Sequence, residues 1–270
     1  MEHRACSSRK DLVVVVACTV LALMSLGAIG SGGRRRAKEA VCLSNLRQWG
    51  VMFEMFTNDN GGYFMEGFAG SASGNNRWIK ALGAYHNYDT NVSCCPEAAT
   101  PWIDEYGQST GLPIGGAFMA WGYVRLSGWA RPFKGSYGIN GWCNNPEPGR
   151  SPGGKPGEFH WRTPNVSDAA GVPLFFGMQR YNAWPEHNDL PPAYDGQSWA
   201  DSGQMTRVCM NRHHGAVNGL FLDFSARKVG LRELWTLKWH RSFSTEGPWT
   251  KAGGAWPEDW PEWMRDFKEY

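Results

Sequence analysis

The first long apolar stretch of the chain covers residues 12–30 and contains no charged residue. Arg9, Lys10 and Asp11 precede it, and three arginines follow it at positions 34–36. Nineteen residues in a helix, at about 1.5 Å each, span roughly 28 Å, which is close to the hydrocarbon thickness of a bilayer. The pattern therefore predicts a transmembrane helix. Its main apolar anchors are Leu12, Val13, Val14, Val15, Val16, Leu21, Leu23 and Leu26.

A cleaved signal peptide is the alternative for this stretch. Such peptides have an apolar core of about 7–15 residues followed by small residues. The apolar run here is longer, although residues 27–30 contain the small residues of a cleavage site. A lipoprotein signal ending at Cys18 fits less well, because the apolar run continues past that cysteine. We prefer an uncleaved or pilin-type anchor to removal after the apolar run.

The pattern changes from uniformly apolar to amphipathic after residue 36. From residue 42 the apolar side chains recur at steps of four, three, four and three, which places them on one face of a helix. Turn-forming residues at 58–62 then end the helix. We expect one long helix over residues 11–58, with a bend or a melted stretch at the glycines between 27 and 33. Its head-packing face is Cys42, Leu46, Trp49, Phe53 and Phe56.

Beyond residue 58 the apolar runs are short and are separated by Gly, Pro and Asn. We predict strands at 117–126, 174–176, 207–210, 220–224 and 228–230, with a hairpin connection at 213–219 and a short helix at 231–239. A long helix followed by antiparallel strands is the order of an α+β fold. The chain thus divides into residues 1–58, the anchor and long helix, and residues 59–270, an extracytoplasmic head with an antiparallel sheet and long loops.

Composition narrows the classes of partner. The formal net charge is only +2, which argues against a dedicated nucleic-acid binder. The 15 tryptophans all follow residue 48, so they belong to the amphipathic part of the helix and to the head. They either seal a loop-rich core or form an exposed ligand platform, and we favour the core for most of them. Those expected to be exposed are Trp249, Trp256, Trp260 and Trp263.

Cysteine and acidic residues suggest two stabilising devices. A head outside the cytoplasm faces oxidising conditions, and its four cysteines (Cys94, Cys95, Cys143 and Cys209) allow three full pairings; among single disulfides we select Cys95–Cys143. Asp189, Asp195 and Asp201 lie in a loop-like stretch that Ca²⁺ could use, with solvated carboxylates as the alternative. The adjacent cysteine and histidine pairs lack zinc-site spacing, so no cofactor is expected apart from this weak calcium candidate.

The sequence contains no complete nucleotide-binding or catalytic motif. Residues 149–155 match the start of a phosphate-binding loop, but Pro156 supplies neither a hydroxyl group nor a backbone N–H for phosphate. His213 and Asp223 could act as an acid–base pair, although their places beside a predicted hairpin favour a structural role. We therefore expect a protein that is not an enzyme.

Several separated segments carry a family resemblance. The acidic residue Asp11 begins the apolar helix, a Cys-x-x-Asn-Leu segment starts at Cys42 some thirty residues later, and residues 58–64 follow as Asn-Asp-Asn-Gly-Gly-Tyr-Phe. Farther on, residues 95–98 and 135–142 match head segments, and His213 and Asp223 occupy the positions of a His-x9-Asp-Gly signature. Together these segments resemble the type IV pilin-like pseudopilins of bacterial type II secretion that carry a large head.

The resemblance implies an assembly protein. It implies a subunit in the bacterial inner membrane, single-pass, with its head in the periplasm or outside the cell. The N-terminal helix would pack with other pseudopilin subunits into a filament, on an inner-membrane secretion platform, with Asp11 setting the register between subunits. At the family's processing site this chain has Arg9 and Lys10 in place of apolar residues. The alternative function is a single-pass or secreted, Trp-rich module that binds glycans or another cell-surface ligand.

Overall fold

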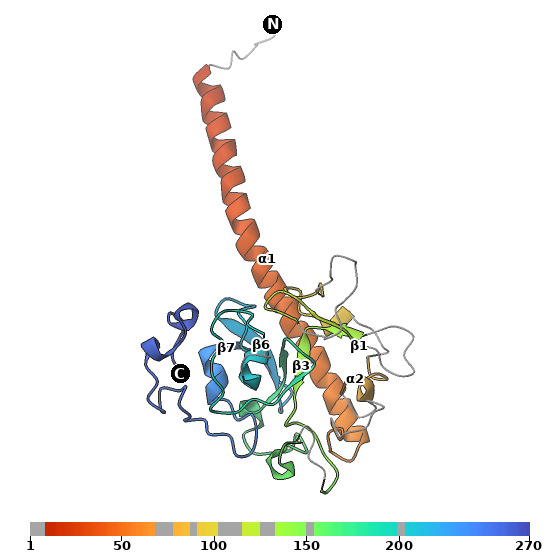
Figure 1. The fold of residues 1–270 in the computed structure, drawn as a ribbon. Helices are drawn as coiled ribbons and strands as arrows, with labels where there is room; N and C mark the ends of the chain where they lie inside the picture. The colour runs from red at the N-terminus through yellow and green to blue at the C-terminus, as the bar shows by residue number, and fades with distance from the viewer. Residues whose placement is uncertain are drawn as a thin grey trace, which may run out of the picture.

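One long helix lies across a β-sheet and continues well beyond it (Figure 1). This arrangement, in a computed structural model, is an α+β fold, as predicted. The structure describes residues 9–67, 78–86, 91–101, 115–124, 133–149, 154–198 and 203–270, with the backbone alone for residues 9–29 and 31.

The long helix, α1 (Arg9–Asp59), presents the predicted apolar face to the head. Cys42, Leu46, Trp49, Phe53 and Phe56 are all buried, which confirms the face read from their spacing. The helix ends within a residue of the predicted position. Its last turn is closed by Gly62, whose N–H donates to the Thr57 carbonyl and whose positive φ an L-residue rarely adopts.

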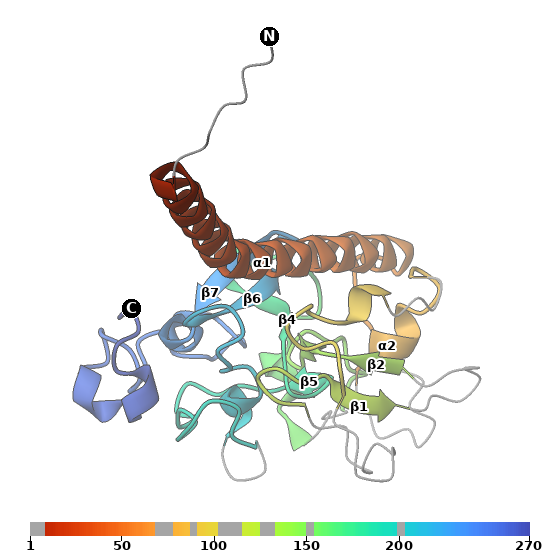
Figure 2. The same ribbon diagram turned by 90° about the horizontal axis from the view of Figure 1, so that it is seen from above.

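The glycines near residue 30 do not melt the helix. The backbone of α1 is helical without interruption from Arg9 to Asp59. Figure 2 shows a change of direction between the projecting part of the helix and the part that lies on the sheet. The melted stretch expected at these glycines is therefore absent from the described backbone.

The predicted location in the bacterial inner membrane, single-pass with the head in the periplasm or outside the cell, is contradicted. No helix in the described part of the chain combines the length and the apolar character needed to cross a bilayer. After Gly32 the helix is charged and exposed through residues 34–38. The side chains predicted as the assembly charge and the anchor lie outside the described residues. They are Asp11, Leu12, Val13, Val14, Val15, Val16, Leu21, Leu23 and Leu26.

The main sheet has five strands in the order β5-β3-β4-β6-β7. Strands β3, β4, β6 and β7 pair antiparallel, whereas β5 lies parallel to β3, so the sheet is mixed rather than antiparallel as predicted. A second, two-stranded sheet pairs β1 with β2. The strands are β1 (Trp121–Val124), β2 (Phe133–Gly135), β3 (Tyr137–Asn140), β4 (Pro173–Gly177), β5 (Asn182–Ala183), β6 (Ala216–Phe221) and β7 (Ala226–Gly230).

Two neighbouring phenylalanines on β4 show how the sheet is covered. Successive side chains of a strand point to opposite faces. Phe175 contacts the rings of Trp49 and Phe53 on α1, while Phe176 contacts Trp239 on the other face. The sheet is thus buried between the long helix and the C-terminal chain, which explains why every residue of β4 is buried.

Most connections are irregular or form short helices. Residues 207–210, predicted as a strand, instead include the end of the 3₁₀ helix η6 (Gln204–Arg207), and the hairpin joins β6 to β7 through residues 222–225. The predicted helix near 231–239 is the 3₁₀ helix η7 (Arg232–Thr236). The other short helices are α2 (Trp78–Ala81), η1 (Asn91–Ser93), η3 (Gly157–Phe159), η4 (Ala169–Gly171), η8 (Pro257–Asp259) and η9 (Glu262–Met264).

Buried tryptophans hold these irregular segments in place. Trp49 donates its indole N–H to the Val92 carbonyl at 2.8 Å, and Trp235 donates to the Asp189 carbonyl at 2.9 Å. A buried carbonyl without a partner is costly, so each bond stabilises a loop that has no strand partner. Six further tryptophans donate to backbone carbonyls in the same way: Trp78, Trp121, Trp142, Trp161, Trp239 and Trp263.

The expectation for the C-terminal tryptophans is only partly confirmed. Trp256 is exposed, but Trp260 is buried and packs edge-on against Trp235 and Trp249. Most of the described tryptophans therefore seal the core, as favoured from the sequence, whereas Trp256 lies on the surface.

Replacing Trp235 by Phe removes the N–H bond to Asp189 and leaves a void in a fully buried site. We expect a loss of about 2 kcal/mol in the free energy of unfolding, measured by urea titration of the full chain. Trp256→Phe is the matched control, because that ring is exposed, and it is expected to change stability by less than about 0.5 kcal/mol. Equal losses in both variants would contradict this account.

Gly50 permits the close approach of α1 to the β6–β7 hairpin. A Cβ atom there would lie 3.1 Å from both Leu220 Cδ1 and the Phe224 carbonyl oxygen. We expect Gly50→Leu to lower the melting temperature of the head by several degrees, since the helix must move away from the hairpin. Gly33→Ala, where nothing lies within 4 Å of the added methyl, is the control and is expected to leave the melting temperature unchanged or raised. Similar losses in both variants would rule out the close approach as the cause.

Candidate functional site

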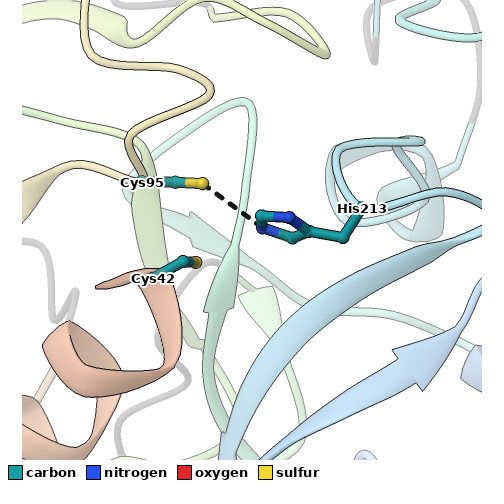
Figure 3. Close-up of side chains that lie close together, drawn as sticks. All are labelled: Cys42, Cys95 and His213. Carbon is teal, nitrogen blue, oxygen red and sulfur yellow. Dashed lines mark hydrogen bonds between the residues drawn. The ribbon is translucent and has the colours of Figure 1, made fainter. Parts of the chain in front are cut away.

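Three potential metal-ligand or redox side chains from distant parts of the chain meet between α1 and the sheet. Figure 3 shows Cys42, Cys95 and His213 pointing toward one another. Their sulfur and nitrogen atoms all lie within 4.8 Å of one another, and Cys95 Sγ lies 3.4 Å from His213 Nε2. All three residues are buried, with exposed fractions of 3% or less. We refer to these three residues as the Cys₂His cluster.

Cys42 reaches the cluster because it begins the buried face of α1. Its sulfur accepts a hydrogen bond of 3.2 Å from the hydroxyl of Tyr137, the first residue of β3. Asn45, one turn farther along the helix, donates to the Cys94 carbonyl at 3.1 Å. The helix is therefore tied both to the sheet and to the segment that carries the second cysteine.

Cys95 is positioned by backbone bonds at the start of β3. Its N–H donates to the Ser136 hydroxyl at 2.7 Å, and the Ser136 N–H donates to the Ser93 carbonyl at 3.0 Å. Because Ser136 separates β2 from β3, this pair of bonds fixes the loop after η1 against the sheet. The sulfur of Cys95 then faces α1 rather than solvent.

His213 occupies a tight turn just before β6. The next two residues, His214 and Gly215, both have positive φ, and the Gly215 N–H donates to the Asn211 side chain at 2.7 Å. The His213 N–H donates to the Ala216 carbonyl at 3.0 Å. This closed turn holds the imidazole beside the start of β6, where its Nε2 atom meets Cys95.

The neighbouring Arg212 is a buried cation. Its guanidinium donates to four backbone carbonyls at 2.6–3.2 Å, and its described hydrogen-bond partners include no carboxylate. Burial lowers the pKa of Arg212, while interactions with Cys95, Cys42 and Tyr137 act in the opposite direction. A cation without a buried anion favours negative charge on the nearby thiols. The carbonyls that it binds belong to Gly116, Ala117, Ser136 and Met178.

The two cysteines of the cluster differ in acidity. Burial raises the pKa of Cys42, but hydrogen bonds from Cys95, Tyr137 and Asn218 and the charge of Arg212 together bring that pKa below its ordinary value. The hydrogen bond to Cys42, and then burial, raise the pKa of Cys95 far above the usual range for a thiol. The hydrogen bonds around the pair therefore favour the thiolate of Cys42 over that of Cys95.

The predicted disulfide between Cys95 and Cys143 is not formed. Both residues are free thiols: Cys95 belongs to the Cys₂His cluster, while Cys143 donates to the Pro173 carbonyl at 3.4 Å. Cys94 and Cys209 are free and buried as well. The prediction failed because it considered only cysteines of the head, whereas the cysteine near Cys95 comes from the helix.

His213 and Asp223, the two signature residues, do not meet. They flank opposite ends of β6, which at about 3.4 Å per residue places them well beyond hydrogen-bonding distance. Asp223 is exposed and accepts hydrogen bonds from the N–H and hydroxyl of Ser225 in the hairpin turn. Its role there is structural, and His213 contributes instead to the Cys₂His cluster.

The carboxylates of the two described calcium candidates, Asp189 and Asp195, accept hydrogen bonds from backbone N–H groups. Asp189 accepts from the N–H groups of Glu186 and Met205, and Asp195 accepts from that of Asn211. Asp201 lies outside the described residues. The groups of described residues that could hold a metal ion include neither Asp189 nor Asp195.

A second group of potential ligands comprises Glu186, His187 and His240. Here the carboxylate is already paired, since Glu186 lies 2.9 Å from His240 Nε2 and 3.1 Å from Lys155 Nζ. Burial raises the pKa of Glu186, but bonds with His240 and Lys155 bring it below its ordinary value. His187 Nδ1 has no hydrogen-bond partner among the described residues, but the carboxylate would have to leave two partners to bind a metal, so this group is a weaker candidate than the Cys₂His cluster.

Sequence reasoning missed this site for an identifiable reason. Cys42 was assigned to the packing face of the helix, Cys95 to a disulfide and His213 to a signature, so each residue already had a separate explanation. The one available signal was that a cysteine on a buried helical face lies in the same chain as a Cys-Pro segment and a His-His-Gly turn.

Comparisons with protein-family models, curated proteins and solved structures gave no match.

Replacing Arg212 by Lys keeps the positive charge, but the ammonium group of lysine cannot donate hydrogen bonds to all four carbonyls that the planar guanidinium binds. We expect a loss of at least about 3 kcal/mol in the free energy of unfolding, measured by denaturant titration. Arg227→Lys is the control, because Arg227 forms a partly exposed ion pair with Glu233, and it is expected to cost less than about 1 kcal/mol. A near-neutral Arg212→Lys would show that the buried fork is dispensable.

Proposed function

We propose that this chain is a non-enzymatic subunit of a pilin-like filament and assembles with other copies through α1. The observation that carries the proposal is that only part of this helix packs on its own head. The ion pairs of α1 with the head that the structure describes begin at Lys38, which bonds Glu97, and Glu39, which bonds Lys228. The helix before these residues projects away from the head (Figure 1).

The projecting part is long. Residues 9–37, at about 1.5 Å each, make roughly 43 Å of helix beyond the first ion pair. Helices gain most of their stability from packing an apolar face, so a single projecting helix is poorly supported by itself. Side-by-side packing of several copies would supply that support, and the uncharged sequence of residues 12–30 suits such packing.

The part of α1 that packs on the head also has an outer face that favours contact with another helix. Val41, Val51 and Met55 are each 48–55% exposed and lie on the side of α1 away from the sheet. At about 100° per residue they fall within an arc of roughly 80°, which makes a narrow apolar stripe. A neighbouring helix of another copy would cover this stripe, leaving the head on the outside of the filament.

The family resemblance of the sequence supports the same function. The segment that begins at Cys42 and the turn at 58–62 belong, respectively, to the packed face of α1 and to its end. Both are therefore features of the helix on which assembly would depend. The head would then provide the surface that contacts neighbouring subunits or cargo.

The proposal is tested by changing the stripe without touching the core. Val51→Glu with Met55→Glu places two charges on the outer face of α1, and we expect large assemblies of the full chain to be lost in sedimentation velocity and negative-stain microscopy. Leu190→Glu with Tyr194→Glu, an equally exposed apolar pair on the head, is the matched control and is expected to assemble like the parent.

Thermal unfolding of both double variants separates assembly from folding. Because all four side chains are exposed, both variants are expected to keep the melting temperature of the dissociated chain. The proposal is wrong if the unmodified chain stays monomeric at all concentrations tested. It is also wrong if the α1 variant assembles as well as the control.

A further inference from the structure

We propose that Cys42, Cys95 and His213 bind a thiophilic metal ion, Zn²⁺ or Cu⁺, which joins the long helix to the head. Two sulfur atoms and one imidazole nitrogen form the ligand set that such ions prefer. The three ligands come from α1, from the loop after η1 and from the turn before β6, as Figure 3 shows. This inference is independent of filament assembly.

The spacing of the ligand atoms agrees with a metal site. A metal–sulfur bond of about 2.3 Å and a metal–nitrogen bond of about 2.0–2.1 Å, at a tetrahedral angle, separate the two ligands by about 3.6 Å. The distance between Cys95 Sγ and His213 Nε2 is 3.4 Å, and all three atoms fall within 4.8 Å of one another. A disulfide instead requires sulfur atoms about 2.05 Å apart, and both cysteines are free.

The positive charge of Arg212 favours thiolate ligands in the cluster. Arg212 is buried beside it with backbone carbonyls as its hydrogen-bond partners, so it lacks a described counter-ion. Two thiolates with Zn²⁺ are neutral, and two thiolates with Cu⁺ carry one negative charge, which Arg212 would balance. The Tyr137 hydroxyl, 3.2 Å from Cys42 Sγ, would stabilise that thiolate in either case.

A cavity lies beside residues that adjoin the cluster in sequence, although none of the three ligands lines it. This cavity, of about 300 Å³, is lined by Arg212, His214 and Glu97, which are close neighbours in sequence of His213 and Cys95. The ion would enter past these side chains and displace protons from the two thiols into solvent. No oxidation or reduction is involved, because the metal keeps its charge on binding.

The test uses the full chain, purified with a reductant and a chelator and then divided into two arms. One arm receives Zn²⁺ and the other receives Cu⁺ with excess glutathione, and bound metal is counted by native mass spectrometry. We expect one ion per chain in at least one arm, and the arm that retains it identifies the ion. Co²⁺ added to the unmodified chain should give thiolate-to-metal absorption bands. This measurement does not depend on whether any variant folds.

Variants assign the site to these residues. Cys42→Ser, Cys95→Ser and His213→Asn are each expected to weaken binding at least about tenfold. Cys143→Ser, which changes an equally buried cysteine outside the cluster, is the matched control and should bind like the parent. The metal should also raise the melting temperature of the parent chain and not that of Cys42→Ser.

Two results with the unmodified chain would overturn the proposal. One is that neither ion is retained and Co²⁺ gives no thiolate band. The other is a chain purified without reductant whose mass is lower by two hydrogen atoms, with Cys42 joined to Cys95, and which binds no metal after reduction. That second result would identify the pair as a disulfide between helix and head. Loss of binding in Cys143→Ser equal to that in Cys42→Ser would likewise contradict the assignment.

Discussion

The indole N–H groups of buried tryptophans are the interaction on which the head depends. The strands are short, at two to six residues, so many backbone carbonyl groups of the head lie outside the strand pairing and need other donors. A tryptophan both fills the core and donates one hydrogen bond, as Trp239 does to Leu234 at 2.7 Å and Trp78 does to Tyr181 at 2.7 Å. Without such donors the loops would bury carbonyl groups that have no hydrogen-bond partner. Each such group would destabilise the fold by at least as much as one hydrogen bond stabilises it.

The close packing of α1 on the sheet explains why reactive side chains meet between them. The helix must lie close to β6 to bury its aromatic face, and Gly50 permits that approach. Closing this gap brings Cys42 beside Cys95 and His213 and leaves Arg212 buried with carbonyl groups as its partners. The Cys₂His cluster thus lies where the helix, the sheet and two loops meet.

Local patterns predicted the elements that depend on local spacing. The apolar face of α1, its end near residue 59, the strand around Phe175 and Phe176, and β7 all follow from periodicity or turn residues. Residues 207–210 were wrongly predicted as a strand, because a short apolar run fits a 3₁₀ turn equally well. The parallel strand β5, only two residues long, has no periodic signal at all.

The sequence by itself determined the α+β class, the packing face of the helix and the concentration of tryptophan outside the apolar segment, because these depend on residues near one another in the chain. The tertiary structure decided which cysteines meet, since Cys42 and His213 are brought together only when α1 crosses the sheet. It also decided that Asp223 and His213 separate to opposite ends of β6. Contacts between distant segments depend on the packed arrangement of all the elements, and no local pattern encodes that arrangement.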